Sequence, residues 1–153
     1  MTFDVEKTRK DFPILSREIQ GNTLTYLDNA ASSQKPMEVL EGIKQFESND
    51  YSNVHRGLHT LSVLSTSAYE ESRKIVQKFL NAKSSEEVIF TSGGTDSVNL
   101  VASSYADENL SQGDEIIITT MEHHANIVPW HFLRERKGIQ IKWIDCDQNG
   151  KFD

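Results

Sequence analysis

The spacing of apolar residues changes along this chain and predicts a helical first part followed by alternating strands and helices. Behind Pro36, which suits the first position of a helix, four apolar residues recur at helical spacing and should face a core: Val39, Leu40, Ile43 and Phe46. A second, long helix is expected over about residues 61–80, with an apolar side formed by Leu61, Leu64, Ala68, Ile75, Val76 and Phe79.

Shorter elements precede these helices. Asp4 is placed to cap a short helix that runs to Lys10, and Pro13 restricts its continuation. Residues 23–28 are predicted as a β-strand, which leads into a turn of small residues at 29–33.

From residue 87 onward the pattern is β-α-β-α-β, which predicts a parallel sheet and an α/β fold. The strands are expected at 87–91, 115–120 and 140–145, and the helices at about 95–110 and 125–137, with Gly138 as a stop. The predicted organisation is an N-terminal segment over 1–60, with a strand, a helix and a loop, followed by the α/β part over 61–153.

The turn at residues 91–96 is the first candidate site. A strand, two glycines and a helix start place free backbone N–H groups and the positive end of a helix dipole at one point, which suits a phosphate. Gly93 and Gly94 let the backbone approach an anion, and Thr95 adds a hydroxyl. The alternative is an ordinary capped turn between a strand and a helix.

His123 is the second candidate. Ligands of parallel sheets bind beyond the carboxyl ends of the strands, which predicts that residues 91–95 and 120–124 share one edge. A histidine there can stack on a flat ligand or move a proton, or it can merely cap the next helix. His124 should point the other way. The sequence shows no cluster of residues spaced as metal ligands, so no metal site is expected.

A loop at residues 51–60 carries two histidines, an arginine and a glycine, and loops of this kind either perform a function or are solvated connections. Cys146 is the one cysteine, so no internal disulfide can form and a cytoplasmic setting is expected. We expect its thiol to be inert.

Composition narrows the class of protein. The 153 residues are 37% hydrophobic and 25% charged, with a formal net charge of −7, which argues against nucleic-acid binding. No apolar run approaches the roughly 20 residues that span a bilayer, and the N-terminus does not resemble a signal peptide. Because the last residues follow an apparent strand within a turn signal, we expect that the chain is part of a longer protein.

Four segments together resemble one family. They are residues 25–31 (TYLDNAA), 53–59 (NVHRGLH), 91–96 (TSGGTD) and 121–130 (MEHHANIVPW). In this order they resemble the N-terminal part of SufS-type cysteine desulfurases, pyridoxal-phosphate enzymes of the class V aminotransferase group. The resemblance covers nearly the whole chain and implies part of the large domain of an aspartate aminotransferase-like transferase.

The resemblance also implies roles for individual residues. His123 would stack over the pyridine ring of pyridoxal 5′-phosphate and help proton transfer, and Gly94 and Thr95 would bind its phosphate. Ala30 and Ala31 would lie near the substrate. His55 and Arg56 would reach the partner subunit's active site in a homodimer.

This chain departs from the family at the phosphate turn. The family often has Thr at the position of Gly94, Glu at that of Asp96 and Arg at that of Ser92. The family's cofactor-bearing lysine and its cysteine nucleophile fall outside these 153 residues, and the surroundings of Cys146 do not match those of the nucleophile.

The resemblance therefore implies an enzyme that takes sulfur from L-cysteine, giving L-alanine and an enzyme persulfide for iron–sulfur cluster assembly, with a sulfur-acceptor protein as partner. The 153 residues alone are expected to be inactive. The alternatives are a selenocysteine lyase, another class V enzyme, or a non-catalytic phosphate-binding α/β module.

Overall fold

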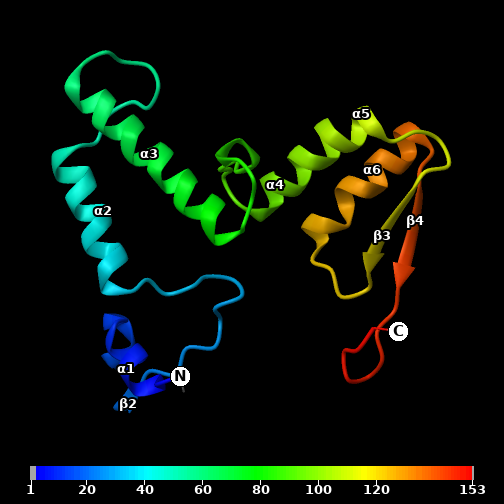
Figure 1. Ribbon diagram of the computed structural model, residues 1–153. Coiled ribbons are helices and arrows are strands. Elements are labelled where there is room, and N and C mark those ends of the chain that lie inside the picture. Colours follow the sequence, from blue (N-terminus) through cyan, green and yellow to red (C-terminus); the bar gives the residue numbers. More distant parts are fainter. Residues whose placement is uncertain (1–2, 153) are drawn as a thin grey trace. The chain divides into compact units, whose positions relative to one another are not determined.

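The computed structural model describes residues 3–152, which form two compact units, one ending at Val88 and the other beginning at Ile89. Figure 1 labels the main elements of both. The first unit consists of short N-terminal elements and two long helices: α1 (Val5–Lys10), a 3₁₀ turn (Pro13–Ser16), β1 (Glu18–Ile19), β2 (Asn22–Thr23), α2 (Met37–Asn49), α3 (Thr60–Phe79) and a second 3₁₀ turn (Ser85–Glu87).

The N-terminal elements follow local sequence signals. The Asp4 carboxylate accepts a hydrogen bond from the Lys7 N–H at 3.0 Å and caps α1 as predicted. β1 and β2 form a two-residue antiparallel pair. The strand predicted over 23–28 is wrong beyond Thr23, because the Tyr26 hydroxyl donates to the carbonyls of Asp28 and Ser32 and stabilises a turn instead.

The two long helices form where expected, but their apolar sides do not face a core. Of the predicted stripe on α2, Val39, Leu40 and Ile43 are all exposed, and α2 contains no buried residue. On α3, Leu61, Leu64, Ile75 and Phe79 are exposed as well. Helical spacing predicts which residues share a side of a helix, whereas burial requires another element to cover that side.

Two serines are the buried residues of α3. Ser62 and Ser65 are 0% and 1% exposed, and each donates a 2.7 Å hydrogen bond to a carbonyl of the preceding loop, Ser62 to Asn53 and Ser65 to Asp50. The loop between α2 and α3 therefore lies along the hydroxyl side of α3, because small polar side chains let a backbone approach and satisfy its carbonyls.

The second unit has the α/β order that the sequence predicts: α4 (Gly94–Val101), a π-helical turn (Ala102–Ala106), α5 (Asp107–Asn109), β3 (Glu115–Thr119), a 3₁₀ turn (His124–Asn126), α6 (Val128–Lys137) and β4 (Gln140–Ile144). β3 and β4 pair in parallel, with Glu115 opposite Gln140 and Thr119 opposite Ile144. Gly138 ends α6 in the left-handed conformation, at φ 74°. The α/β class is thus confirmed.

One predicted strand does not form. Over residues 3–152 the structure assigns no strand to 87–91, although Val88 has an extended backbone and a buried side chain. An apolar run predicts an extended segment, but a strand also requires a neighbour that supplies hydrogen bonds along its length. The observed sheet of this unit therefore contains β3 and β4.

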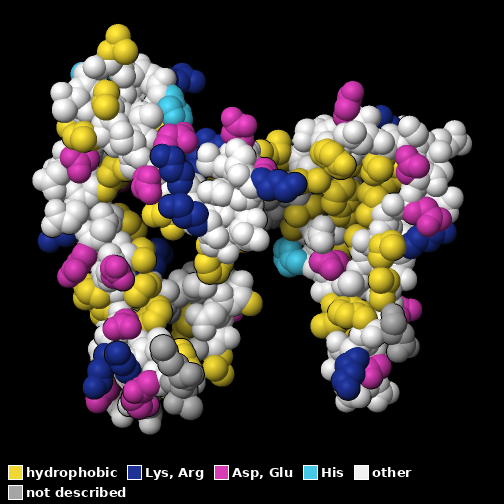
Figure 2. Space-filling model, in the orientation of Figure 1, with side chains coloured by type: hydrophobic (Ala, Val, Ile, Leu, Met, Phe, Trp, Pro, Cys, Tyr) yellow, Lys and Arg dark blue, Asp and Glu magenta, His cyan; other side chains and the backbone are white. Residues whose placement is uncertain are grey.

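The core of the second unit lies between the helices and β3–β4. Ala106, Leu133 and Ile139 are buried together, and Leu110, Ile116 and Trp130 pack against them. Figure 2 shows hydrophobic side chains on the visible face over the helices of this unit; the exposed large ones in α4, the π-helical turn and α6 are Leu100, Val101, Tyr105, Val128 and Phe132. None of the helices within residues 3–152 is long and apolar enough to cross a membrane.

Candidate functional site

The glycine turn at residues 91–96 has a defined internal structure. The Thr91 hydroxyl lies 2.7 Å from that of Ser97, and the Ser97 N–H donates to the Gly93 carbonyl at 3.0 Å. Gly93 has φ 153° and ψ 178°, a region of backbone conformation that is essentially confined to glycine. The sequence of the turn therefore determines a sharp entry into α4.

This turn leaves donors available for an anion. Among residues 3–152, the N–H groups of Gly94, Thr95 and Asp96 have no hydrogen-bond acceptor, since they belong to the first turn of α4. An open cavity of about 540 Å³ lies against them, bordered by Ser92–Asp96 and Asn99. Three free amides at the positive end of a helix dipole suit a phosphate group.

Asp96 changes the charge of this turn. Its carboxylate accepts the Ser92 N–H at 3.1 Å and thereby withdraws one amide from the set that an anion could use. The negative carboxylate stabilises the positive end of the α4 dipole, but it repels a second negative charge nearby. Phosphate binding here therefore depends on the free amides of Gly94, Thr95 and Asp96 and on the exposed Thr95 hydroxyl.

His123 lies in the turn that follows β3, and α4 packs against the 3₁₀ turn that begins at His124. The exposed His123 ring accepts the Ala125 N–H at Nδ1, at 3.2 Å, so it caps this short turn, and its centroid is 6.2 Å from that of His124. His123 is not among the described residues that border the cavity at the glycine turn.

The residue before His123 is the most strongly hydrogen-bonded group of this turn. The Glu122 carboxylate accepts from the Asn126 side chain at 3.0 Å and from the Thr119 hydroxyl at 2.8 Å. These two bonds, the Asn126 bond first, lower the pKa of Glu122 below its ordinary value. The carboxylate is therefore ionised at neutral pH and fixed to both ends of the turn.

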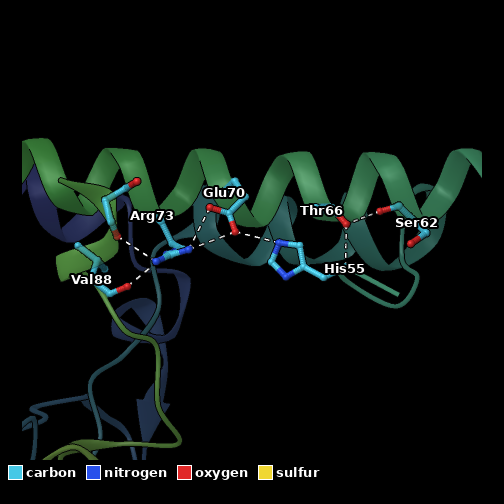
Figure 3. Close-up of polar contacts among 7 residues, drawn as sticks. His55, Ser62, Thr66, Glu70, Arg73 and Val88 are labelled. Carbon is cyan, nitrogen blue, oxygen red and sulfur yellow. Dashed lines mark hydrogen bonds and ion pairs between the residues drawn. The ribbon is translucent and has the colours of Figure 1, made fainter. Parts of the chain in front are cut away.

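His55 is held in the loop before α3 by a polar network (Figure 3). The Nε2 atom of its ring lies 2.9 Å from the Glu70 carboxylate, and its backbone N–H donates to the Thr66 hydroxyl at 3.0 Å. Arg73 binds the same carboxylate at 3.1 Å and also donates to the carbonyls of Ser85 and Val88. His55 has a positive φ of 60°, which the surrounding hydrogen bonds maintain.

The network leaves the next residues of the loop projecting. Arg56 is exposed and, within residues 3–152, has neither an ion pair nor a hydrogen bond, while the Leu58 side chain is fully exposed. Gly57 packs against Ser62, where an added Cβ would lie 2.8 Å from the Ser62 side chain. The loop therefore presents Arg56 from a fixed backbone.

Ala30 and Ala31 lie in a turn of the first unit in which the Ala31 N–H donates to the Asp28 carbonyl at 3.2 Å. Both side chains are exposed. Asn29 borders an adjacent cavity of about 390 Å³, which is also lined by Arg9, Phe12, Leu15, Thr23, Leu24, Thr25, Tyr26, Leu27 and Gln34.

Several residues that hold the loop of His55 are not evident from the apolar pattern of the sequence. The side chains of Glu70 and Arg73 are only 31% and 22% exposed; Glu70 binds His55, and Arg73 binds Glu70 and two backbone carbonyls. Thr66, Glu70 and Arg73 are spaced by about one helical turn, and this spacing, which places them on one side of α3, is the sequence signal for the network. Cys146 is half-buried with a free thiol and forms a β-bridge to Phe152.

Comparison with known proteins identifies the family to which this chain belongs. The model of the family described as aminotransferase class-V matches residues 25–153, so the chain belongs to that family. A cysteine desulfurase of Salmonella dublin is 53% identical over 150 residues, which are 98% of this chain and 37% of that protein.

Solved structures give the same result for the fold. The apo structure of a cysteine desulfurase from Thermococcus onnurineus NA1 matches 100% of this chain and 36% of its own, with a TM-score of 0.85 and 38% identity. The cysteine desulfurase CsdA from Escherichia coli matches 97% and 36%, with a TM-score of 0.72 and 35% identity. The chain thus has the aspartate aminotransferase-like α/β fold and spans somewhat over a third of these relatives.

Proposed function

We propose that this chain is the N-terminal part of a cysteine desulfurase that uses pyridoxal 5′-phosphate, and more narrowly one of SufS type. The observation that carries the proposal is the start of α4, where Gly94 and Thr95 offer free amides directly after a glycine turn, in a chain of the class V family. The relatives named cysteine desulfurase support the reaction.

In this proposal the residues of the chain bind the cofactor and leave room for the substrate. The Gly94 and Thr95 amides and the Thr95 hydroxyl hold the phosphate of the cofactor, and His123 covers its ring. Ala30 and Ala31 lie beside the substrate, and their short side chains leave room for it. The cofactor, when bound, supplies an electron sink for breaking the bond between carbon and sulfur.

The overall reaction transfers one sulfur atom. The C–S bond of L-cysteine breaks, a cysteine thiol of the enzyme becomes a persulfide, and L-alanine is released with the hydrogen that the thiol gave up. The persulfide sulfur then passes to an acceptor protein for iron–sulfur cluster assembly. We propose that the full-length enzyme is a cytoplasmic homodimer in which His55 and Arg56 reach the partner subunit's site.

The phosphate site is tested by binding pyridoxal 5′-phosphate and pyridoxal to the 153-residue chain and comparing the two affinities. We expect the phosphorylated ligand to bind more tightly. Thr95→Val should weaken it about three- to tenfold by removing one hydroxyl donor, without affecting pyridoxal. Ser103→Ala, which removes an exposed hydroxyl of the π-helical turn that donates to the Asn99 carbonyl, is the control. Equal binding of both ligands would contradict the phosphate site.

The activity is tested by measuring alanine release from L-cysteine. The full-length enzyme should release alanine in the presence of the cofactor, whereas we expect the 153 residues alone to release none. Alanine release from the short chain would refute this part of the proposal, and release from L-selenocysteine alone would favour a selenocysteine lyase.

A further inference from the structure

Four side chains tie the turn after β3 to the start of α6. Thr119 donates to Glu122 at 2.8 Å, Asn126 donates to Glu122 at 3.0 Å, and the Trp130 indole N–H donates to Asn126 at 2.9 Å. Each of these bonds is partly buried. We call these four residues the Glu122 bracket. Glu122 and Asn126 each take part in two of these bonds, so the four side chains form one connected series that fixes the turn at both ends.

His123 lies inside this bracket and is bound at two atoms. Its carbonyl accepts the Asn126 N–H at 2.8 Å, and its Nδ1 accepts the Ala125 N–H at 3.2 Å. A neutral imidazole has one nitrogen that donates and one that accepts. Since Nδ1 accepts here, the ring hydrogen must be on Nε2.

We infer that Glu122 and Asn126 are positioning residues that hold His123 in the tautomer with hydrogen on Nε2. The neutral ring therefore offers a hydrogen-bond donor at its other nitrogen, Nε2. The position of this donor against the cofactor rests on the proposed function, whereas the tautomer itself does not.

The charge of Glu122 is consistent with this role. Its pKa is lowered by the bonds from Asn126 and Thr119, so at neutral pH the carboxylate accepts both hydrogen bonds at once. A neutral amide at position 122 could accept through one atom only.

The tautomer is tested on the 153-residue chain with ¹⁵N-labelled histidine, by long-range ¹H–¹⁵N correlation at neutral pH. His123→Gln identifies the signals of this ring among the five histidines. We expect the pattern of a protonated Nε2 and an unprotonated Nδ1. Hydrogen on Nδ1, or rapid exchange between the two neutral forms in comparable amounts, would overturn the inference.

The bracket is tested with two variants. Asn126→Ala removes the side chain that forms two of the three bonds of the bracket. Thr119→Val removes one donor while keeping the side-chain shape, so it remains informative if the first variant does not fold. Each should shift the tautomer ratio of His123 by about fivefold, the effect of one weakened hydrogen bond. Thr120→Val, whose hydroxyl contacts the Ile144 carbonyl at 3.5 Å, should leave the ratio unchanged.

The results also separate this inference from the proposed function. If both bracket variants keep the tautomer of the parent chain, the positioning role is wrong, whatever the chain binds. If the tautomer shifts as expected but the affinities for pyridoxal 5′-phosphate and pyridoxal are equal, the positioning role stands and the phosphate site is wrong.

Discussion

Replacing the two buried serines of α3 by alanine should destabilise the first unit. Ser62→Ala or Ser65→Ala deletes a 2.7 Å hydrogen bond and leaves the carbonyl of Asn53 or Asp50 without that donor. The loss of a buried partner costs about 1–3 kcal/mol. Alanine recovers about 0.5 kcal/mol through its higher helix propensity. We therefore expect each variant to lower the free energy of unfolding by about 0.5–2.5 kcal/mol.

Urea unfolding monitored by tyrosine fluorescence measures this change. Both tryptophans, Trp130 and Trp143, lie in the second unit, so tryptophan emission reports on that unit and not on α3. Ser72→Ala is the matched control, because the exposed Ser72 hydroxyl binds only the Ala68 carbonyl of its own helix. Its effect should stay within about 0.5 kcal/mol of zero.

Amide hydrogen exchange of the loop at residues 53–59 gives a second measurement. Ser62→Ala should accelerate exchange there, since the loop loses its bond to α3, whereas Ser72→Ala should not. If both buried-serine variants are as stable as Ser72→Ala, then the hydroxyls of α3 do not hold the loop that carries His55 and Arg56.

Two further predictions concern backbone space and pH. Gly57→Ala should lower stability by about 1–3 kcal/mol in the same urea assay because its Cβ would lie 2.8 Å from Ser62; Gly42→Ala, with nothing within 4 Å, should instead raise it by about 0.5–1 kcal/mol. The pKa of Asp147 is lowered by the backbone N–H groups of Lys151 and Asn149, so the order of this turn should be full above the ordinary aspartate pKa and decrease as pH falls through the lowered one. Amide chemical shifts of Lys151 follow this change; shifts that move at the ordinary pKa, as for an unbonded aspartate, would contradict it.

The sequence by itself determined the elements whose signals are local. Asp4 caps α1, Gly138 ends α6, and the alternation after residue 94 produces helix, strand, helix and strand as predicted. The four quoted segments pointed to the class V family, which matches over residues 25–153. These signals depend on hydrogen bonds and dihedral angles within a few residues, and such terms can be read from a short window.

Only the tertiary structure decided which sides of the elements are covered. It placed Ser62 and Ser65 against a backbone loop while Leu61, Leu64, Ile75 and Phe79 of α3 remained exposed. It also left residues 87–91 without a strand. It also brought Asn126 and Thr119 to one carboxylate beside His123. Burial, strand pairing and side-chain networks depend on what a second segment supplies, and the spacing of residues within one segment does not contain that information.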